Sequence, residues 1–349
     1  MNQSLIQYPA SSIQYRASLL IWTIFPILLF FIITGCSDKE IVLSGHTMGT
    51  TYRVKVVAGY FQATAGLQNK IDKRLADINQ SMSTYLNQSE ISRFNRFGKT
   101  GEKFMVSEDF IRVMQVAEKV YTASEGAWDG TLGPIVNLWG FGAKGRNVRV
   151  PHSKEILQQL KNVGFHRLIR VDGRYLIKSN PLVTLDFASI AKGYGVDQVA
   201  ELIRASGFNN YLVEIGGEVF ASGVRIDGDP WRIGVNTPRK DASIQQVFKV
   251  ATLKNRAMAT SGDYRNFFEI DGKRYSHVID PRNGYPVANG VVSVSITAES
   301  CTFADGLATA VMVMGPEKGL ALVNRLEQVE GLIIVDDGGT LVEYASDNF

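Results

Sequence analysis

An aspartate and a threonine, Asp305 and Thr309, stand four residues apart in the stretch "ADGLATA", directly before the apolar run "VMVMG". Side chains four residues apart lie on the same face of a helix, one turn from each other. A carboxylate and a hydroxyl in this arrangement offer two oxygen ligands to a hard cation such as Mg²⁺. The spacing also allows a structural interpretation, a capping box in which Thr302 is the N-cap and Asp305 is the third helical residue.

Other chemistries lack their motifs in this sequence. It contains no Walker lysine loop, no H-E-x-x-H, no C-x-x-C and no G-x-S-x-G, and its four histidines are scattered. A zinc site is therefore not expected. The letters of "GFGAKG" (140–145) match G-x-G-x-x-G, but no helix start follows them, so they do not predict a dinucleotide-binding turn. The chemistry that the sequence still allows is a hard cation bound by oxygen ligands.

Four further polar clusters interrupt apolar segments of the chain. They are "SMSTYLNQSEISRFN", "GAWDGTLGPIVNLWGFG", "TLDFASIAKGYGVD" and "RYSHVIDPRNG". Each has an ordinary explanation when it is taken singly: the aspartates form turns, the lysine is solvated, and the histidine belongs to the core. Their combination and order favour a functional site.

These clusters, together with "HTMGTTY", "EIGGEVFASG" and "ADGLATAVMVMG", resemble the ApbE family of FAD:protein FMN transferases. The resemblance runs from about residue 44 to the C-terminus. It implies Mg²⁺-dependent transfer of FMN from FAD to a threonine or serine hydroxyl of an exported acceptor, with release of AMP. The implied acceptors are subunits of the sodium-translocating NADH:quinone reductase or of the Rnf complex. Two alternatives stay open, a Mg²⁺-dependent FAD pyrophosphatase and a non-catalytic flavin-binding lipoprotein.

The resemblance also implies roles for single residues. The FAD contacts it implies are Met48, Tyr85, Ala127, Trp128, Asp129, Asp186, Lys192 and His277. The metal ligands it implies are Asp305, Thr309 and Ser189, or the Ala188 carbonyl in place of the Ser189 side chain. Catalysis is expected to depend on Asp305 and on His277, which would accept the proton of the acceptor hydroxyl because imidazole titrates near neutral pH. Asp280 is expected to orient His277.

The elements that carry these residues predict an α+β fold with largely antiparallel mixed sheets and packed helices. Apolar spacing predicts helices over 68–84, 107–126, 189–207 and from 302, with Ser107 as an N-cap and Gly126 and Gly207 as stops. Alternating, β-branched segments predict strands in 46–59, 181–187, 209–225, 231–238, 247–262, 266–280, 291–300 and 330–345. The family resemblance implies two intimately joined lobes with the flavin site between them.

The amino-terminal segment differs from the rest. Arg16 precedes the uncharged run 17–36, which reads as a secretory signal or, alternatively, as a short transmembrane anchor. Its end, "IITGC", resembles a bacterial lipobox, which implies cleavage before Cys36 and a diacylglycerol on its sulfur. We therefore predict a signal peptide at 1–35, a tether at 36–44 and a flavin transferase domain at 45–349. The protein is expected to be an exported lipoprotein on the periplasmic side of the inner membrane.

Charge and cysteine content argue against two further features, a nucleic-acid partner and a disulfide. The net charge of +3 is spread along 349 residues without a long basic block, so nucleic acid is not an expected partner. Cys301 is the second of two cysteines, and a lipidated Cys36 leaves it without a disulfide partner. It is expected to be a small core residue beside a helix.

Overall fold

The structure is a computed structural model that describes residues 38–142, 149–239, 246–263 and 266–349. The predicted signal peptide, Cys36 and residues 143–145 of "GFGAKG" lie outside these described residues. Within them, no helix has the length and apolar character needed to cross a membrane.

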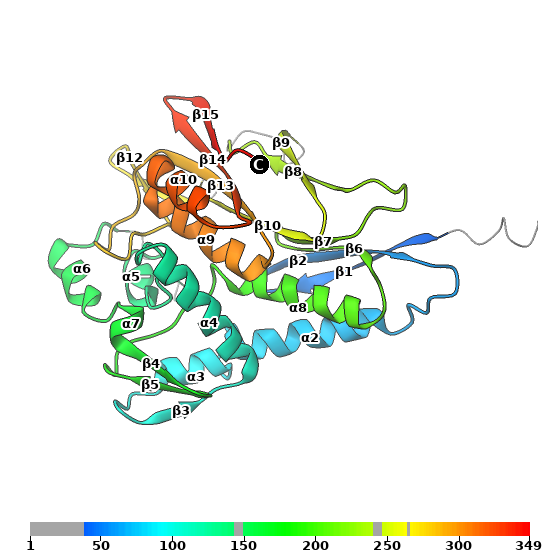
Figure 1. Ribbon diagram of the computed structural model, residues 1–349. Helices are drawn as coiled ribbons and strands as arrows, with labels where there is room; N and C mark the ends of the chain where they lie inside the picture. The colour runs from blue at the N-terminus through cyan, green and yellow to red at the C-terminus, as the bar shows by residue number, and fades with distance from the viewer. Residues whose placement is uncertain (1–37, 143–148, 240–245, 264–265) are drawn as a thin grey trace, which may run out of the picture.

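An eight-stranded antiparallel sheet organises the fold, in the order β1-β2-β6-β7-β10-β13-β14-β15 (Figure 1). Its strands are β1 (Lys39–Thr47), β2 (Thr50–Ala58), β6 (Asn210–Ile215), β7 (Glu218–Ser222), β10 (Arg256–Gly262), β13 (Val291–Ala298), β14 (Glu330–Asp337) and β15 (Thr340–Ala345). All residues of β13 are buried. A strand buried on both faces requires a layer on each side of the sheet.

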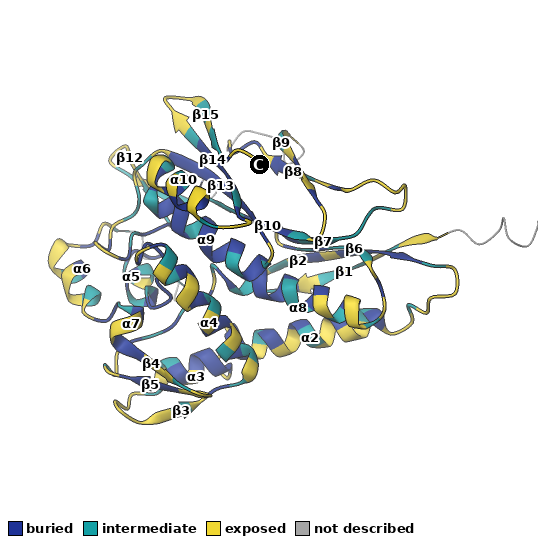
Figure 2. Ribbon diagram, in the orientation of Figure 1, coloured by how far each residue is buried: buried dark blue, intermediate teal, exposed yellow. Residues whose placement is uncertain are grey.

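Helices supply one of these layers. They are α2 (Leu67–Met82), α8 (Ala191–Ala205), α9 (Cys301–Met314) and α10 (Pro316–Arg325). The innermost is α9, which packs on β10, β13 and α8 and is dark blue along most of its length in Figure 2. The other face is covered by the hairpin of β8 (Trp231–Asn236) and β9 (Val247–Leu253), whose Trp231 joins an apolar cluster with residues of β7, β10 and β14.

A second group of elements packs beside the large sheet. It comprises the antiparallel sheet β3 (Lys103–Met105)–β5 (Tyr175–Lys178)–β4 (Ile169–Asp172) and the helices α3 (Glu90–Arg96), α4 (Glu108–Ala123) and α7 (Phe165–Leu168). The main apolar core extends from Val54 in the large sheet to Leu176 in the small one, so a common core joins the two groups. The α+β, largely antiparallel architecture is confirmed.

A smaller apolar cluster surrounds Trp139 at one end of the molecule. Its elements are α5 (Gly133–Leu138), α6 (Ser153–Leu160), β11 (Phe267–Ile270) and β12 (Lys273–Ser276). The indole of Trp139 lies against Tyr275 and donates a hydrogen bond to the Gly284 carbonyl. This cluster fixes the segment that follows β12 and contains His277.

Most predicted elements are present, and two predictions are wrong. Residues 39–44, expected in a tether, belong to β1, because their backbone pairs with β2 and two of their aliphatic side chains, Ile41 and Leu43, pack on the core. Residues 181–187 form no strand. The side-chain amide of Asn95 takes the place of a strand partner, donating to the Leu185 carbonyl (2.8 Å) and accepting from the Leu185 N–H (2.7 Å).

Candidate active site

One cavity of about 470 Å³ collects nearly all of the predicted site residues. Its lining includes Tyr85, Ala127, Trp128, Asp129, Asp186, Ala188, Ser189, Lys192, His277, Asp305 and Thr309. These residues are spread over more than 220 positions of the chain, and the fold brings them to one place. The size suits a bound small molecule.

The helix that carries Asp305 begins differently from the capping-box interpretation, which is wrong. Ser300 is the N-cap of α9 and its hydroxyl accepts from the Phe303 N–H. Thr302 donates its hydroxyl to Asp197 of α8 (2.6 Å), whose carboxylate also accepts from the Ser300 hydroxyl and from the N–H groups of Cys301 and Thr302. A buried carboxylate at a helix N-terminus is favoured by the helix dipole. It joins α9 to α8.

Asp305 itself is held between the two helices. Its Oδ2 accepts a hydrogen bond from the Gly193 N–H at 3.0 Å, while its Oδ1 lies 3.9 Å from the Lys192 ammonium, beyond hydrogen-bond length. Gly193 allows this approach, because a Cβ there would lie 2.4 Å from the Cys301 carbonyl oxygen. One turn further along α9, the Thr309 hydroxyl lies 3.0 Å from that of Ser261.

These oxygens match the preferences of a hard cation. The described residues contain no group of three or more His, Cys, Asp and Glu side chains able to hold a metal. A cation beside Asp305 would therefore need neutral oxygens among its ligands. Ala188 borders the cavity, and its carbonyl accepts no hydrogen bond from the described residues. The Ser189 hydroxyl accepts from the Trp128 indole N–H at 2.9 Å. The donor set fits Mg²⁺.

Lys192 supplies the positive charge of the cavity. Its ammonium forms an ion pair with Glu218 at 2.7 Å, and the Glu218 side chain is only 3% exposed. Burial lowers the pKa of Lys192, but the charges of Asp305 and Glu218 outweigh it, so the net shift is upward. Burial raises the pKa of Glu218 to about 7, although Lys192 partly opposes this shift. The site therefore combines two carboxylates and one ammonium within a few ångströms.

His277 lines the same cavity from the segment after β12. Its Nδ1 is 2.9 Å from the Asn266 carbonyl oxygen, and since a carbonyl can only accept, Nδ1 carries the proton and Nε2 has a free lone pair. Burial lowers the pKa of the imidazole. The expectation that Asp280 orients His277 is wrong, because that carboxylate binds the Arg282 guanidinium through both oxygens, at 2.8 Å each.

The wall formed by residues 127–129 is rigid. Asp129 accepts from the N–H and hydroxyl of Thr131 and from the Phe165 N–H, and burial raises its pKa against these hydrogen bonds. Asp186 accepts from the Ala188 N–H (2.9 Å), and burial raises its pKa as well. The Trp128 ring is buried, with only 3% of the residue exposed. These carboxylates shape the wall through their backbone hydrogen bonds.

The two remaining predicted residues lie differently. Tyr85 borders the cavity in the loop after α2 and is 76% exposed, so its ring is available to a ligand. Met48 is not among the residues that line the cavity. It occupies the β1–β2 turn with a positive φ of 50°, and it packs on the core, where a Cβ on Gly195 would lie 3.0 Å from the end of its side chain.

Several lining residues were not predicted from the sequence. They are Glu218, Thr260, Ser261 and Asn266. Glu218 carried a signal, since a charged residue follows the glycine pair of "EIGGE" at the start of an otherwise apolar strand. Nothing in the sequence indicated that the hydroxyls of Thr260 and Ser261 in β10, or the backbone of Asn266, belong to the site. Their positions depend on strand register and on the path of a loop.

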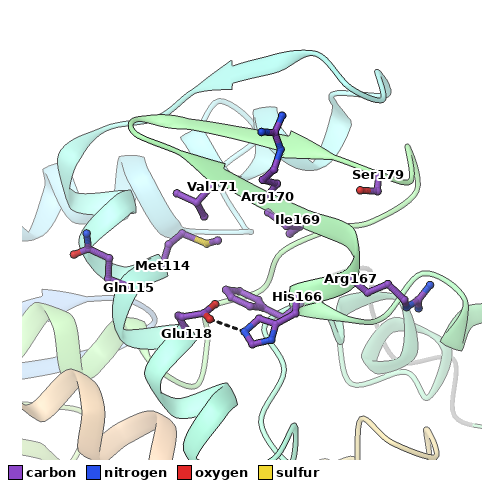
Figure 3. A pocket seen from close by; sticks show the side chains of 10 residues that line it. Met114, Gln115, Glu118, His166, Arg167, Ile169, Arg170, Val171 and Ser179 are labelled. Atoms are coloured by element: carbon purple, nitrogen blue, oxygen red, sulfur yellow. Dashed lines mark ion pairs between the residues drawn. The ribbon is translucent and has the colours of Figure 1, made fainter.

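A second hollow of about 600 Å³ lies between α4 and β4, as Figure 3 shows. Its lining includes an ion pair between His166 and Glu118 at 2.6 Å and apolar side chains such as Met114 and Ile169. None of the predicted site residues that the structure describes lines it. The chemistry-bearing residues gather in the first cavity.

The protein has an α+β fold in which the 470 Å³ cavity is lined by most of the residues that the family resemblance implies. The profile of the ApbE family matches residues 48–333. The chain therefore belongs to the ApbE family. Cys301, the predicted core cysteine, is buried within the matched region, as expected.

Proteins similar to this chain carry a common name. The chain is 44% identical over 322 residues to the FAD:protein FMN transferase of Vibrio cholerae, covering 91% of this chain and 95% of that protein. It is 40% identical over 313 residues to the enzyme of the same name from Haemophilus influenzae, covering 88% and 90%. Among solved structures, the flavin transferase ApbE from Vibrio cholerae superposes with a TM-score of 0.81 at 42% identity, covering 89% of this chain and 98% of that one.

Proposed function

We propose that this protein transfers FMN from FAD to a threonine or serine hydroxyl of an acceptor protein and releases AMP. The observation that carries the proposal is the setting of Asp305. Asp305 is only 3% exposed, yet it borders the cavity. One of its carboxylate oxygens has no hydrogen bond, and the Thr309 hydroxyl lies one helical turn away. A carboxylate held in this way suits cation binding better than a structural role. The names of the relatives support a flavin transferase.

A Mg²⁺ ion fits this site, with Asp305, Thr309 and a backbone oxygen as ligands. We favour the Ala188 carbonyl over the Ser189 side chain as the third ligand, because the serine hydroxyl already accepts from Trp128. When bound, the ion would neutralise diphosphate oxygens and stabilise negative charge on the AMP leaving group. Lys192 would add a second positive charge beside the same anion.

The residues of the chain account for the remaining steps. The acceptor oxygen attacks the FMN-side phosphorus, a new P–O bond forms, and the bond to the AMP phosphate breaks. His277 takes the hydroxyl proton at Nε2, because Nδ1 is held as a donor by the Asn266 carbonyl. The exposed ring of Tyr85 and the wall of Ala127 and Trp128 would hold the flavin and adenine portions of FAD.

The test incubates the protein with FAD, Mg²⁺ and an exported redox protein of the NADH:quinone reductase or Rnf type. We expect covalent flavin fluorescence on the acceptor after denaturing electrophoresis, one AMP per flavin, and loss of both with EDTA or in an Asp305→Asn variant. Asp77→Asn, which alters an exposed ion pair, is the matched control and should transfer normally. Release of free FMN without a labelled acceptor would indicate an FAD pyrophosphatase instead. Binding of FAD without any turnover would indicate a non-catalytic flavin-binding protein.

We further propose that the protein is exported and anchored to the periplasmic side of the inner membrane by lipid on Cys36. The support is the sequence of residues 17–36 alone. Mass spectrometry of the mature protein should find a chain that begins at Cys36 with a diacylglycerol on its sulfur. A mature chain that keeps residues 17–35, or a Cys36 without lipid, would refute the lipid anchor.

A further inference from the structure

Lys192 stands between two carboxylates at unequal distances. Its Nζ is 2.7 Å from Glu218 Oε1 and 3.9 Å from Asp305 Oδ1. Only the first distance is short enough for a hydrogen bond. The ammonium is therefore drawn to Glu218, and the nearer oxygen of Asp305 receives no hydrogen bond from it.

The buried position of Glu218 lowers the stability of the fold. It opens β7 directly after the Gly216–Gly217 turn, and its side chain is 3% exposed. Its Oε1 binds Lys192, but its Oε2 has no hydrogen-bond partner among the described residues. A buried carboxylate with an unpaired oxygen costs stability. Fold stability alone does not explain this glutamate.

The other carboxylates of the cavity do not compete for Lys192. Asp129 binds the Thr131 and Phe165 N–H groups, and Asp186 binds the Ala188 N–H. Within the described part of the chain, the ion pairs of Lys192 involve only Glu218 and Asp305. Without Glu218, the ammonium would have Asp305 as its one partner. A movement of about 1 Å along a flexible four-carbon chain would close that gap to a direct ion pair.

We propose that Glu218 is a positioning residue that holds Lys192 away from Asp305 and so keeps Asp305 Oδ1 free to bind a divalent cation. This inference rests on the proposed Mg²⁺ site. Lys192 and the cation would compete for Asp305 Oδ1, and Glu218 favours the cation because it binds the Lys192 ammonium. The unpaired Oε2 of Glu218 is the cost of keeping that carboxylate at the cavity.

The experiment measures cation binding directly, with Mn²⁺ as the probe and free Mn²⁺ followed by its electron paramagnetic resonance signal, without and with saturating FAD. The informative variant is Glu218→Asp, which keeps the charge but is one methylene shorter and cannot hold the ammonium in its present place. We expect Glu218→Asp to weaken Mn²⁺ binding at least tenfold. Adding Lys192→Met to it should restore the affinity to within about threefold of the unchanged protein.

Controls separate this mechanism from general electrostatics and from misfolding. Glu214→Gln removes a carboxylate of the neighbouring strand β6, whose side chain binds the Gly217 N–H, and should leave the affinity within twofold. Circular dichroism and the thermal midpoint without cation show whether each variant is folded. If Glu218→Asp binds Mn²⁺ like the unchanged protein, or if Lys192→Met fails to restore binding, the inference is wrong.

The same titration tests the proposed function separately. If the unchanged protein binds no Mn²⁺ with or without FAD, or if Asp305→Asn binds it equally well, the metal site itself is wrong and the inference falls with it. If Asp305→Asn abolishes binding but Glu218→Asp has no effect, the metal site stands and only the role of Glu218 is refuted.

Discussion

The contact between α8 and α9 at Gly193 leads to a prediction whose size can be worked from the structure. A Cβ at this position would lie 2.4 Å from the Cys301 carbonyl oxygen and 2.9 Å from Asp305 Cβ. Ordinary contacts begin near 3.4 Å, so Gly193→Ala would force the two helices about 1 Å apart. The obstacle is backbone, which cannot rotate away as a side chain can.

Two consequences follow for Gly193→Ala. The hydrogen bond from the Gly193 N–H to Asp305, now 3.0 Å, would stretch beyond useful length. Overpacking costs about 1–3 kcal/mol, which corresponds to a fall in the melting temperature of about 1–5 °C in a chain of this size. Displacing Asp305 by about 1 Å is expected to slow flavin transfer about 100-fold, since reacting groups tolerate little misplacement.

The matched control is Gly195→Ala on the same helix. It gains the same helix propensity, about 1 kcal/mol, but its Cβ would meet the ends of the Met48, Ile215 and Leu75 side chains at 3.0–3.7 Å, which can shift. Scanning calorimetry gives the stability of both variants, and in-gel flavin fluorescence of the acceptor gives their rates. If Gly193→Ala equals Gly195→Ala in both measurements, the close approach of the two backbones does not position Asp305.

Two further predictions concern His277 and Asp197. His277→Ala should lower the transfer rate about 10²–10⁴-fold at saturating FAD. The unchanged enzyme should lose rate as the pH falls through an inflection below 6.5, because burial lowers the pKa of His277 and the protonated ring cannot accept a proton. An inflection above 6.5 in a pH series of initial rates would contradict this assignment. Asp197→Asn replaces an acceptor oxygen by a donor opposite N–H and O–H groups, so we expect a loss of about 1.5–3 kcal/mol in a urea titration, whereas Asp77→Asn should change stability by less than about 0.5 kcal/mol.

The local order of the chain was largely readable from its sequence. Helical spacing, N-caps and glycine stops predicted α2, α4 and α8, and alternation with turn residues predicted the strands of the large sheet. Two failures share one physical reason, since neither segment is decided locally. Residues 39–44 become a strand because β2 offers an edge, and residues 181–187 do not because Asn95 takes the place of a partner.

The site was predicted through its motifs, and its geometry was not. The sequence indicated that Asp305 and Thr309 share a helix face, because that relation is set by backbone repeat alone. It could not indicate that Ser300 rather than Thr302 caps α9, that Asn266 rather than Asp280 fixes the His277 tautomer, or that Glu218 pairs with Lys192.

The sequence by itself determined which side chains are available and where most of the longer helices and strands lie, since these depend mainly on neighbours within a few residues. Only the tertiary structure decided which of those side chains meet, which carboxylate oxygen stays unpaired, and that Met48 packs on the core instead of lining the cavity. The reason is that hydrogen bonds and ion pairs between residues more than a hundred positions apart depend on how whole elements pack, and no local pattern records that packing.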